Sequence, residues 1–265
     1  MINPAEVLDL FDLQMRQGIQ PDGPEARVEH VGAVVRHIDP FGGWNGVVWS
    51  DLDRDTADTA IAEQLRHFSD LGCELEWKLY AHDRPEDLAE RLLAAGFVPE
   101  PEEALMVVAI SDLPTGAALP EGVRLLPVTD PDGVDLMIEV HERAFASDSA
   151  RLRNRLLAQV DQGPETFSMV VAMAGDEPVC AARMEMHPGT DFAGLWGGGT
   201  VPDWRGRGLY RALVAHRARI AAERGFRYLQ VDASDGSRPI LQRLGFTRLS
   251  STTPYLHGPE AADPR

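Results

Sequence analysis

Cysteine is scarce in this sequence of 265 residues, and long apolar runs are missing altogether. The two cysteines, Cys73 and Cys180, lie far apart and form no Cys-x-x-Cys pair or metal-ligand spacing, so we expect reduced core thiols and no metal. No apolar run of about 18 residues occurs, and no signal-like apolar block opens the chain. We therefore expect a soluble, cytoplasmic protein that makes no membrane contact.

Positive charge is also in short supply. The chain has 25 Lys and Arg residues against 42 Asp and Glu residues, which gives a formal net charge of −17. Like charge repels, so this balance argues against nucleic acid and against an anionic membrane as partners. The length suffices for one large or two ordinary domains, and a hydrophobic content of 44% supports a sizeable core.

Against this background, one segment is rich in arginine and glycine. A strand of small residues that ends at Thr200 runs into a Pro-Asp turn, then into Arg205-Gly206-Arg207-Gly208, and then into an amphipathic helix. Backbone N–H groups point out of a helix N-terminus, and glycines let an anion approach the main chain closely. The segment from Arg205 to Arg211 therefore predicts a pyrophosphate site, which we call the anion cradle.

The cradle lacks the marks of the two commonest nucleotide sites. No Gly-Lys-Ser/Thr follows the loop, which excludes a P-loop, and Arg211 stands where a dinucleotide fingerprint needs its third glycine. A Gly/Arg surface turn ahead of a helix remains the structural alternative.

The same residues resemble the acyl-CoA loop of the GCN5-related N-acetyltransferases, whose pattern is Arg/Gln-x-x-Gly-x-Gly/Ala after a Pro-Asp-aromatic turn. Arg205 and Gly208 match the pattern, whereas Tyr210 stands where the family usually has Gly or Ala. The resemblance covers about 122–255. It implies the acyl-CoA N-acyltransferase fold, an α/β fold with a mixed central sheet and flanking helices. Two central strands, 192–200 and 226–233, would splay apart to admit pantetheine.

By this resemblance the cofactor is acetyl-CoA, bound as the acyl donor without a metal. The backbone of Gly198 and Thr200 would meet the pantetheine arm, where glycines 197–199 leave room for it. The expected cofactor-binding residues are Gly198, Thr200, Arg205, Gly206, Arg207, Gly208, Leu209, Tyr210, Arg211, Ser234 and Ser237. For the two serines, helix capping ahead of 239–244 is an equal alternative.

Catalytic residues are harder to assign. Leu241 occupies the position where the family often has a tyrosine acid, and the strand 192–200 carries no carboxylate. Glu185 is our candidate base, acting through a water, and Tyr255 our candidate proton donor to sulfur. An exposed strand carboxylate and a packing tyrosine are the corresponding structural alternatives, and His141 and His187 are further candidates.

The spacing of apolar residues and the positions of turn residues predict the helices and strands around the cradle. We expect helices at 130–146 and 149–160, and strands at 167–174 and 179–187 joined through Gly175-Asp176. In the helix after the cradle, the apolar stripe would be Leu209, Leu213, His216 and Ile220.

The N-terminal half repeats, weakly, the order of elements found in the C-terminal half. Segments 71–97 and 224–246 both read helix, Gly, strand, Arg-Pro, short helix and Gly-Phe. Residues 52–55 of the first half contain acids and no glycine where a cradle would lie. We thus expect two tandem modules: 1–112 as a degenerate domain without a cofactor loop, 113–120 as a linker, 121–258 as the acetyltransferase domain and 259–265 as a mobile tail.

Three functions follow from these residues. The first is an acetyl-CoA-dependent N-acetyltransferase in which the primary amine of a small molecule or peptide attacks the thioester directly. The second is a catalytically silent acyl-CoA-binding or regulatory module, and the third is an interaction protein with an aromatic patch formed by 41–44 and Trp49. The acceptor, the acyl chain length and the oligomeric state stay open.

Overall fold

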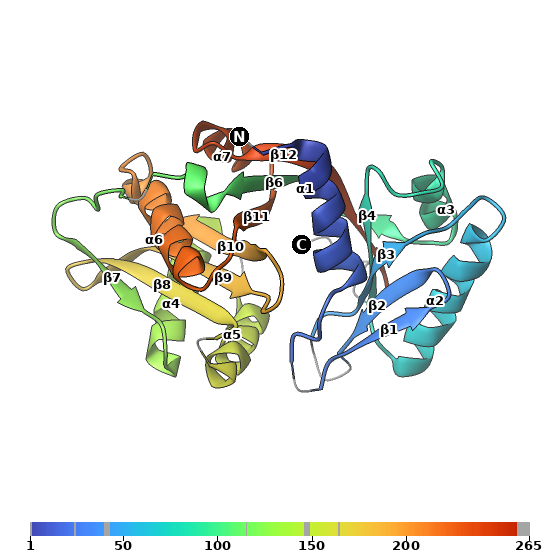
Figure 1. Ribbon diagram of the computed structural model, residues 1–265. Helices are drawn as coiled ribbons and strands as arrows, with labels where there is room; N and C mark the ends of the chain where they lie inside the picture. Colours follow the sequence, from blue (N-terminus) through green and yellow to red (C-terminus); the bar gives the residue numbers. More distant parts are fainter. Residues whose placement is uncertain are drawn as a thin grey trace. The chain divides into compact units, whose positions relative to one another are not determined.

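The computed structural model describes residues 2–23, 25–39, 43–114, 116–145, 149–163 and 165–258 (Figure 1). The chain forms two compact units. Unit 1 consists mainly of Val107–Val231 and Leu241–Phe246, and unit 2 of Asn3–Met106, Asp232–Ile240 and the residues from Thr247 onward. The predicted tail at 259–265 and two residues of the predicted aromatic patch, Phe41 and Gly42, lie outside the described residues.

Unit 1 is a mixed sheet with helices packed on it. Its strands follow the order β7 (Val123–Pro127), β8 (Phe167–Ala174), β9 (Glu177–Met186), β10 (Phe192–Thr200) and β11 (Tyr228–Ala233), the last two residues of β11 falling in unit 2. Neighbouring strands are antiparallel except β10 and β11, which are parallel. The connections are α4 (Pro131–Phe145), α5 (Ala150–Gln162), α6 (Leu209–Glu223) and the short 3-10 turns η2 (Ile110–Asp112) and η3 (Pro202–Trp204).

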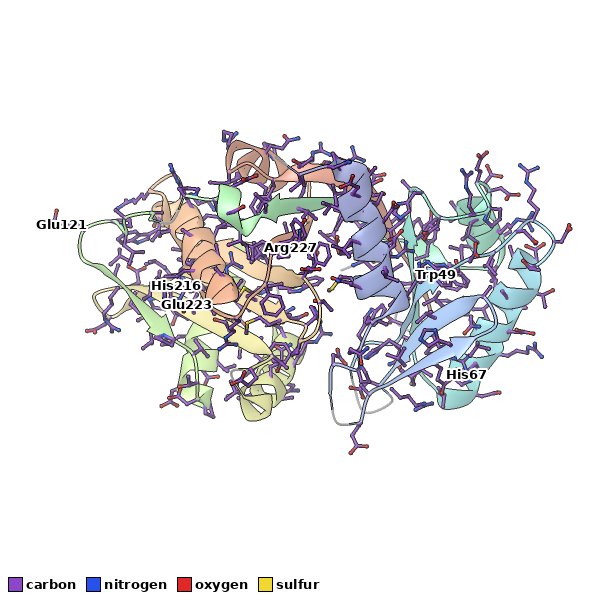
Figure 2. All side chains as sticks on the ribbon, viewed as in Figure 1. Trp49, His67, Glu121, His216, Glu223 and Arg227 are labelled. Carbon is purple, nitrogen blue, oxygen red and sulfur yellow. The ribbon has the colours of Figure 1, made fainter. Side chains whose placement is uncertain are left out.

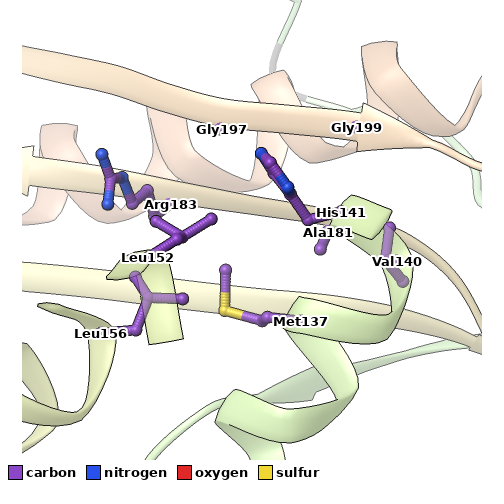
Figure 3. Close-up of a pocket in the computed structure, with 9 residues that line it drawn as sticks. All are labelled: Met137, Val140, His141, Leu152, Leu156, Ala181, Arg183, Gly197 and Gly199. Carbon is purple, nitrogen blue, oxygen red and sulfur yellow. The ribbon is translucent and has the colours of Figure 1, made fainter. Parts of the chain in front are cut away.

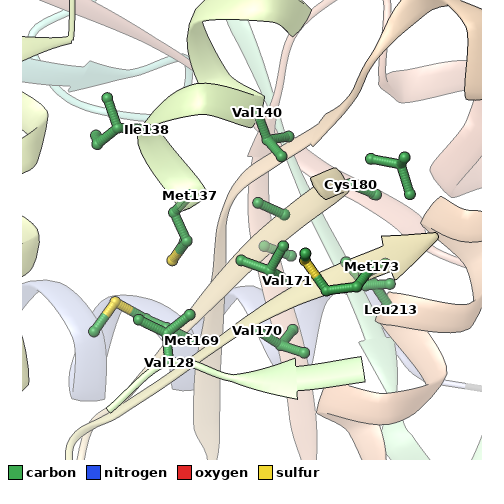
Figure 4. Packing of buried hydrophobic residues seen from close by; sticks show 14 of the residues in the cluster. Val128, Met137, Ile138, Val140, Met169, Val170, Val171, Met173, Cys180 and Leu213 are labelled. Carbon is green, nitrogen blue, oxygen red and sulfur yellow. The ribbon is translucent and has the colours of Figure 1, made fainter. Parts of the chain in front are cut away.

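The core of unit 1 forms where α4, α5 and α6 bury their apolar faces against β8 and β9. Val134 and Met137 of α4 meet Val170 and Val171 of β8, and Leu213 of α6 joins the same cluster (Figure 4). The boundaries predicted for these helices and strands agree with the structure to within about two residues, because the apolar period was unbroken there.

The predicted stripe of α6 is partly wrong. Leu209 and Leu213 are buried as expected, but His216 on α6 (Figure 2) is half-buried, whereas Arg217 is buried. The Arg217 side chain donates from Nε to the Leu213 carbonyl and from Nη1 to the Arg183 carbonyl. These acceptors, which a hydrophobicity pattern does not contain, allow a guanidinium to take a core position.

Unit 2 repeats the strand plan of unit 1 at smaller size. Its sheet order is β1 (Arg27–Val31), β2 (Val34–Ile38), β3 (Gly46–Ser50), β4 (Leu75–Tyr80) and β12 (Thr247–His257), and β5 (Val98–Pro99) pairs with β12. As with β10 and β11, the parallel pair β3 and β4 is joined through a helix, α2 (Ala57–Leu71). The remaining elements are α1 (Pro4–Phe11), the π-helix η1 (Asp12–Gln17), α3 (Leu88–Ala94), α7 (Arg238–Arg243), which is divided between the units, and β6 (Glu103–Ala109), which runs from unit 2 into unit 1.

The units do not follow the chain in simple succession. Strand β12 pairs with β4 over Thr252–His257, so the last strand of the sequence completes the sheet of the N-terminal half. The predicted boundary at 113–120 divides the chain by sequence, whereas the compact units interleave at 232–246. In the described part of the chain, no helix is long and apolar enough to cross a membrane.

Candidate functional site

The cradle is an exposed loop whose conformation is held by hydrogen bonds from its own Arg205. Arg205 donates from Nε to the Thr200 carbonyl at 3.2 Å and from Nη2 to the Ala144 carbonyl at 2.9 Å. Gly206 and Gly208 have φ of +76° and +84°, a left-handed backbone that side chains rarely adopt. The two hydrogen bonds of Arg205 and the left-handed backbone at Gly206 and Gly208 thus fix the conformation of the loop that leads into α6.

The amide groups of the cradle are available to a ligand. Gly206, Arg207 and Gly208 are exposed, and among the described residues no backbone acceptor engages their N–H groups. Gly208 caps α6 without a side-chain hydrogen bond, and Ala212 N–H donates to the Gly208 carbonyl as the first bond of the helix. The N–H groups of 209–211 therefore have no partner within the helix, which is the arrangement that binds anions at helix N-termini.

The cationic side chains of the cradle divide into two roles. Arg207 and Arg211 are exposed, and the Arg207 guanidinium lies 4.6 Å from the centre of the Trp204 ring. They add positive charge at the helix terminus, where it favours a diphosphate. Arg205 was predicted to bind the cofactor, but its side chain donates to two backbone carbonyls and thereby positions the loop.

The strands beside the cradle open as the resemblance implies. Parallel pairing between β10 and β11 is confined to 192–194 with 228–230, although β10 continues to Thr200. On its other edge β10 carries a bulge, since Trp196 pairs with Arg183 and Gly199 with Ala181, which places Gly197 and Gly198 opposite one residue. Beyond Gly194, the β11-facing edge of β10 has no strand partner among the described residues of unit 1.

The glycines of the bulge differ from their predicted role. A Cβ on Gly198 would lie 2.9 Å from Cε2 of Tyr210, and one on Gly199 would lie 3.0 Å from Cε2 of Phe145. Missing side chains here make room for two aromatic rings, one of them the Tyr210 that departs from the family pattern. The Thr200 carbonyl, expected at the pantetheine arm, already accepts from Arg205.

A small cavity adjoins the bulge on the face of the sheet covered by α4 and α5 (Figure 3). Its volume is about 100 Å³, and its lining is mostly apolar, with Met137, Val140, His141, Leu152, Leu156, Ala181, Arg183, Gly197 and Gly199. Figure 3 shows His141 projecting from α4 toward the bulged part of β10. The cavity is thus a mostly apolar pocket that carries two polar side chains.

Burial lowers the pKa of both polar side chains, His141 and Arg183. Desolvation and the Arg183 charge lower the pKa of His141, so the imidazole is neutral at pH 7, and its Nδ1 lies 2.8 Å from the Ser149 hydroxyl. Arg183 is 8% exposed, and burial lowers its pKa despite the opposing effect of Glu185. Sequence reasoning weighed His141 and missed Arg183, whose only signal was a positive charge among the apolar residues of β9.

The other predicted site residues are distributed over both units. Glu185 of β9 lies in unit 1, on the same strand face as Arg183, and accepts a 3.4 Å hydrogen bond from Gln159 of α5. Glu185 is not among the residues that line the cavity. Tyr255 lies in unit 2, where it is 8% exposed within a hydrophobic cluster that includes Trp77, and burial raises its pKa.

The two serines take up the structural alternative. Ser234 and Ser237 belong to unit 2, and the Ser237 hydroxyl and backbone N–H both bond to the Ser234 carbonyl, with Arg238 N–H as a further donor to it. These bonds form the turn that opens α7. Leu241, at the expected position of the tyrosine acid, is fully buried.

The corresponding place in unit 2 is closed to an anion. Asp53 Oδ1 accepts 2.9 Å hydrogen bonds from the N–H groups of Asp55 and Thr56, just before α2. Strands β3 and β4 pair only at 46–47, and where they part, Arg16 donates from Nε to the Val48 carbonyl at 2.9 Å. An acidic cap and a buried arginine therefore occupy the positions that stay open in unit 1.

Part of the chain is similar to known acetyltransferases. The model of the acetyltransferase (GNAT) family matches residues 134–246. A protein named mycothiol acetyltransferase, from Pseudarthrobacter chlorophenolicus, is 29% identical over 194 residues, which cover 68% of this chain and 58% of the length of that relative.

Solved structures share the fold over nearly the whole chain. A GCN5-related N-acetyltransferase from Kribbella flavida superposes with a TM-score of 0.72 at 20% identity, covering 100% of both chains. One from Sphaerobacter thermophilus gives 0.61 at 17% identity, over 97% of this chain and 93% of the other. A tandem GNAT protein from the clavulanic acid biosynthesis pathway gives 0.62 at 13% identity, over 96% and 94%.

The predicted acyl-CoA N-acyltransferase fold with two GNAT-like modules is confirmed by these likenesses and by the repeated strand plan. With an open cradle and a parted strand pair, residues 134–246 match the model of the acetyltransferase (GNAT) family, and the chain shares the fold of the GCN5-related N-acetyltransferases.

Proposed function

We propose that the protein is an acetyl-CoA-dependent N-acetyltransferase that acts on the primary amine of a small molecule or peptide. One observation carries the proposal: Gly206, Arg207 and Gly208 are exposed just before α6, and the N–H groups of 206–211 have no backbone partner among the described residues. Such donors at a helix N-terminus suit a diphosphate. Bound acetyl-CoA would supply the thioester carbonyl that the amine attacks.

The cavity beside the bulge supports an acceptor site of modest size. Gly197 and Gly199 belong both to the cavity lining and to the strand whose free edge would lie along the pantetheine arm. An amine in the cavity would thus reach the reacting carbonyl from the α4 face. A volume of about 100 Å³ suits a small group rather than a folded partner.

His141 is the proposed base. The neutral imidazole can accept the proton that the attacking amine must lose, and the Ser149 hydroxyl orients its ring. Glu185, the candidate base of the sequence analysis, lies on the same face of the sheet as Arg183 and remains the alternative base, acting through a water. For the proton donor to sulfur, Tyr255 remains a prediction.

The cradle can be tested with a pair of variants of equal shape. Asn and Asp both tolerate the left-handed backbone of position 208, so Gly208→Asn and Gly208→Asp differ by one charge at the helix terminus. We expect titration calorimetry to show acetyl-CoA binding at least about 10-fold weaker to Gly208→Asp than to Gly208→Asn, because a carboxylate opposes the diphosphate. Equal affinities for the two variants would place the diphosphate elsewhere.

A catalytically silent acyl-CoA-binding module is the second candidate, favoured by the buried Leu241 at the usual tyrosine position. A screen for CoA release across many amines distinguishes the two. Turnover with any amine excludes the silent module, and binding of acetyl-CoA without turnover of any amine favours it.

A further inference from the structure

The most unusual group in the cavity is the guanidinium of Arg183. Its side chain is 8% exposed, yet Nε and Nη1 have no hydrogen-bond partner among the described residues. The carboxylate that acts on it, Glu185, does so through its charge and not through a hydrogen bond. Buried charges in proteins are normally paired, because desolvation without a partner is costly.

The neighbours of Arg183 do not supply the missing acceptors. The guanidinium lies 5.9 Å from the centre of the Trp196 ring, which offers no acceptor oxygen, and the cavity around it is lined by leucine, methionine, valine and alanine side chains. Glu185, two residues along the strand, acts on it only over a longer distance. By contrast, Arg217, a buried arginine of α6, bonds to two backbone carbonyls.

The position of Arg183 ties it to the reacting groups. Its Nε lies 3.9 Å from the place that a Cβ on Gly197 would occupy, so the guanidinium is directly beside the bulge of β10. Resting on the proposed function, we infer that the acceptor amine carries a carboxylate, and that this carboxylate binds to Arg183 in the cavity. Two free N–H donors of a guanidinium suit a carboxylate in number and in charge.

Charge balance favours a carboxylate over a phosphate. Among the described residues of the cavity lining, Arg183 has the one cationic side chain, and its single positive charge matches the single negative charge of a carboxylate. A doubly charged phosphate would leave an excess negative charge in this mostly apolar cavity. An acceptor of the amino-acid type is therefore the class that the cavity fits.

The inference can be tested with the twenty common L-amino acids and the carboxamide of each, using CoA release from acetyl-CoA as the readout. We expect at least one acid to be acetylated with a kcat/KM about 100-fold above that of its carboxamide, since the amide leaves Arg183 without an anionic partner. Arg183→Met should lose about 100-fold with that acid and change little with the carboxamide.

Two further variants control this result. Arg155 on α5 is exposed and contributes to the electrostatic field at Arg183, so Arg155→Met removes the same charge outside the cavity and should act like the native protein. Arg183→Lys keeps the charge and should retain part of the preference for the acid. If Arg183→Met does not fold, the ratio between acid and carboxamide in the native protein decides the question.

The outcomes separate the inference from the proposed function. Carboxamides turned over as well as acids would overturn the role of Arg183 and leave the acetyltransferase intact. Acetyl-CoA binding with no turnover of any compound in either series would overturn the inference, and the wider amine screen would then decide the proposed function. If Arg155→Met abolished the preference for acids and Arg183→Met left it unchanged, the carboxylate would bind at α5 instead.

Discussion

Buried arginines show how far a residue's role depends on what it contacts. Arg217 and Arg183 both stand at core positions of unit 1, and burial lowers the pKa of Arg217 to about 10. Arg217 satisfies backbone carbonyls and thereby joins α6 to β9, whereas the free donors of Arg183 face a cavity. The sequence alone could not separate the two, because tertiary packing determines which groups each guanidinium contacts.

The proposed base makes a prediction at the same scale. Asn can replace the Nδ1 contact of His141 with Ser149 but cannot take up a proton, so His141→Asn should lower kcat/KM by about 100-fold. The acid limb of the native pH profile should fall below the ordinary histidine pKa of 6.5, since burial and Arg183 lower the pKa of His141. Activity therefore rises with pH through that lowered pKa and is independent of this group at pH 7 and above.

Steady-state rates between pH 5 and 9 provide the measurement, with Glu185→Gln as the matched control that removes a carboxylate from the same face of the sheet. The acid limb should vanish in His141→Asn and persist in Glu185→Gln. The reverse result would make Glu185 the base, as the sequence had suggested.

Elements were predictable where a local pattern determines them. The strand 192–200 and the helix that starts after Gly208 have the bounds expected from their small residues, Pro-Asp turn and glycines. The cavity was not predictable, because Met137 and His141 of α4 meet Ala181 and Arg183 of β9 only through tertiary packing. Likewise, no local signal shows that the ring of Tyr210 packs on Gly198.

Helix η1 has a structural role in unit 2 that can be measured. Arg16 binds both carboxylate oxygens of Asp83 at 2.7 Å, and the two side chains are 3% and 4% exposed. Arg16→Met would leave the Asp83 carboxylate buried without its partner, so we expect a loss of about 3–5 kcal/mol in the free energy of unfolding.

Urea unfolding of the full chain measures this loss. The double variant Arg16→Met with Asp83→Asn removes both charges and should recover most of the stability, because the uncompensated carboxylate is then absent. A loss below about 1 kcal/mol in Arg16→Met alone would show that the pair contributes little.

The whole molecule contains two copies of one strand plan, of which the sequence shows only a weak trace. The Gly, Arg-Pro and Gly-Phe order indicated the repeat, and the absence of glycine at 52–55 indicated that the first copy lacks a cradle. The interleaving of the units could not be foreseen, because the pairing of β12 with β4 joins residues more than 170 positions apart. The alternation of apolar and polar residues predicts that β12 is a strand, but it does not indicate which strand pairs with it.

Because the two copies differ at the cradle, the full chain should bind one acetyl-CoA. In unit 2 the Asp53 carboxylate already accepts the N–H groups before α2, and its negative charge repels a diphosphate there. Titration calorimetry should therefore give a stoichiometry of one. Gly208→Asp should weaken that single event, whereas Asp53→Asn, which preserves an acceptor for the same amides, should leave both affinity and stoichiometry unchanged. A stoichiometry of two in the native chain, or one that persists at full affinity in Gly208→Asp, would mean that the N-terminal module holds the cofactor despite its acidic cap.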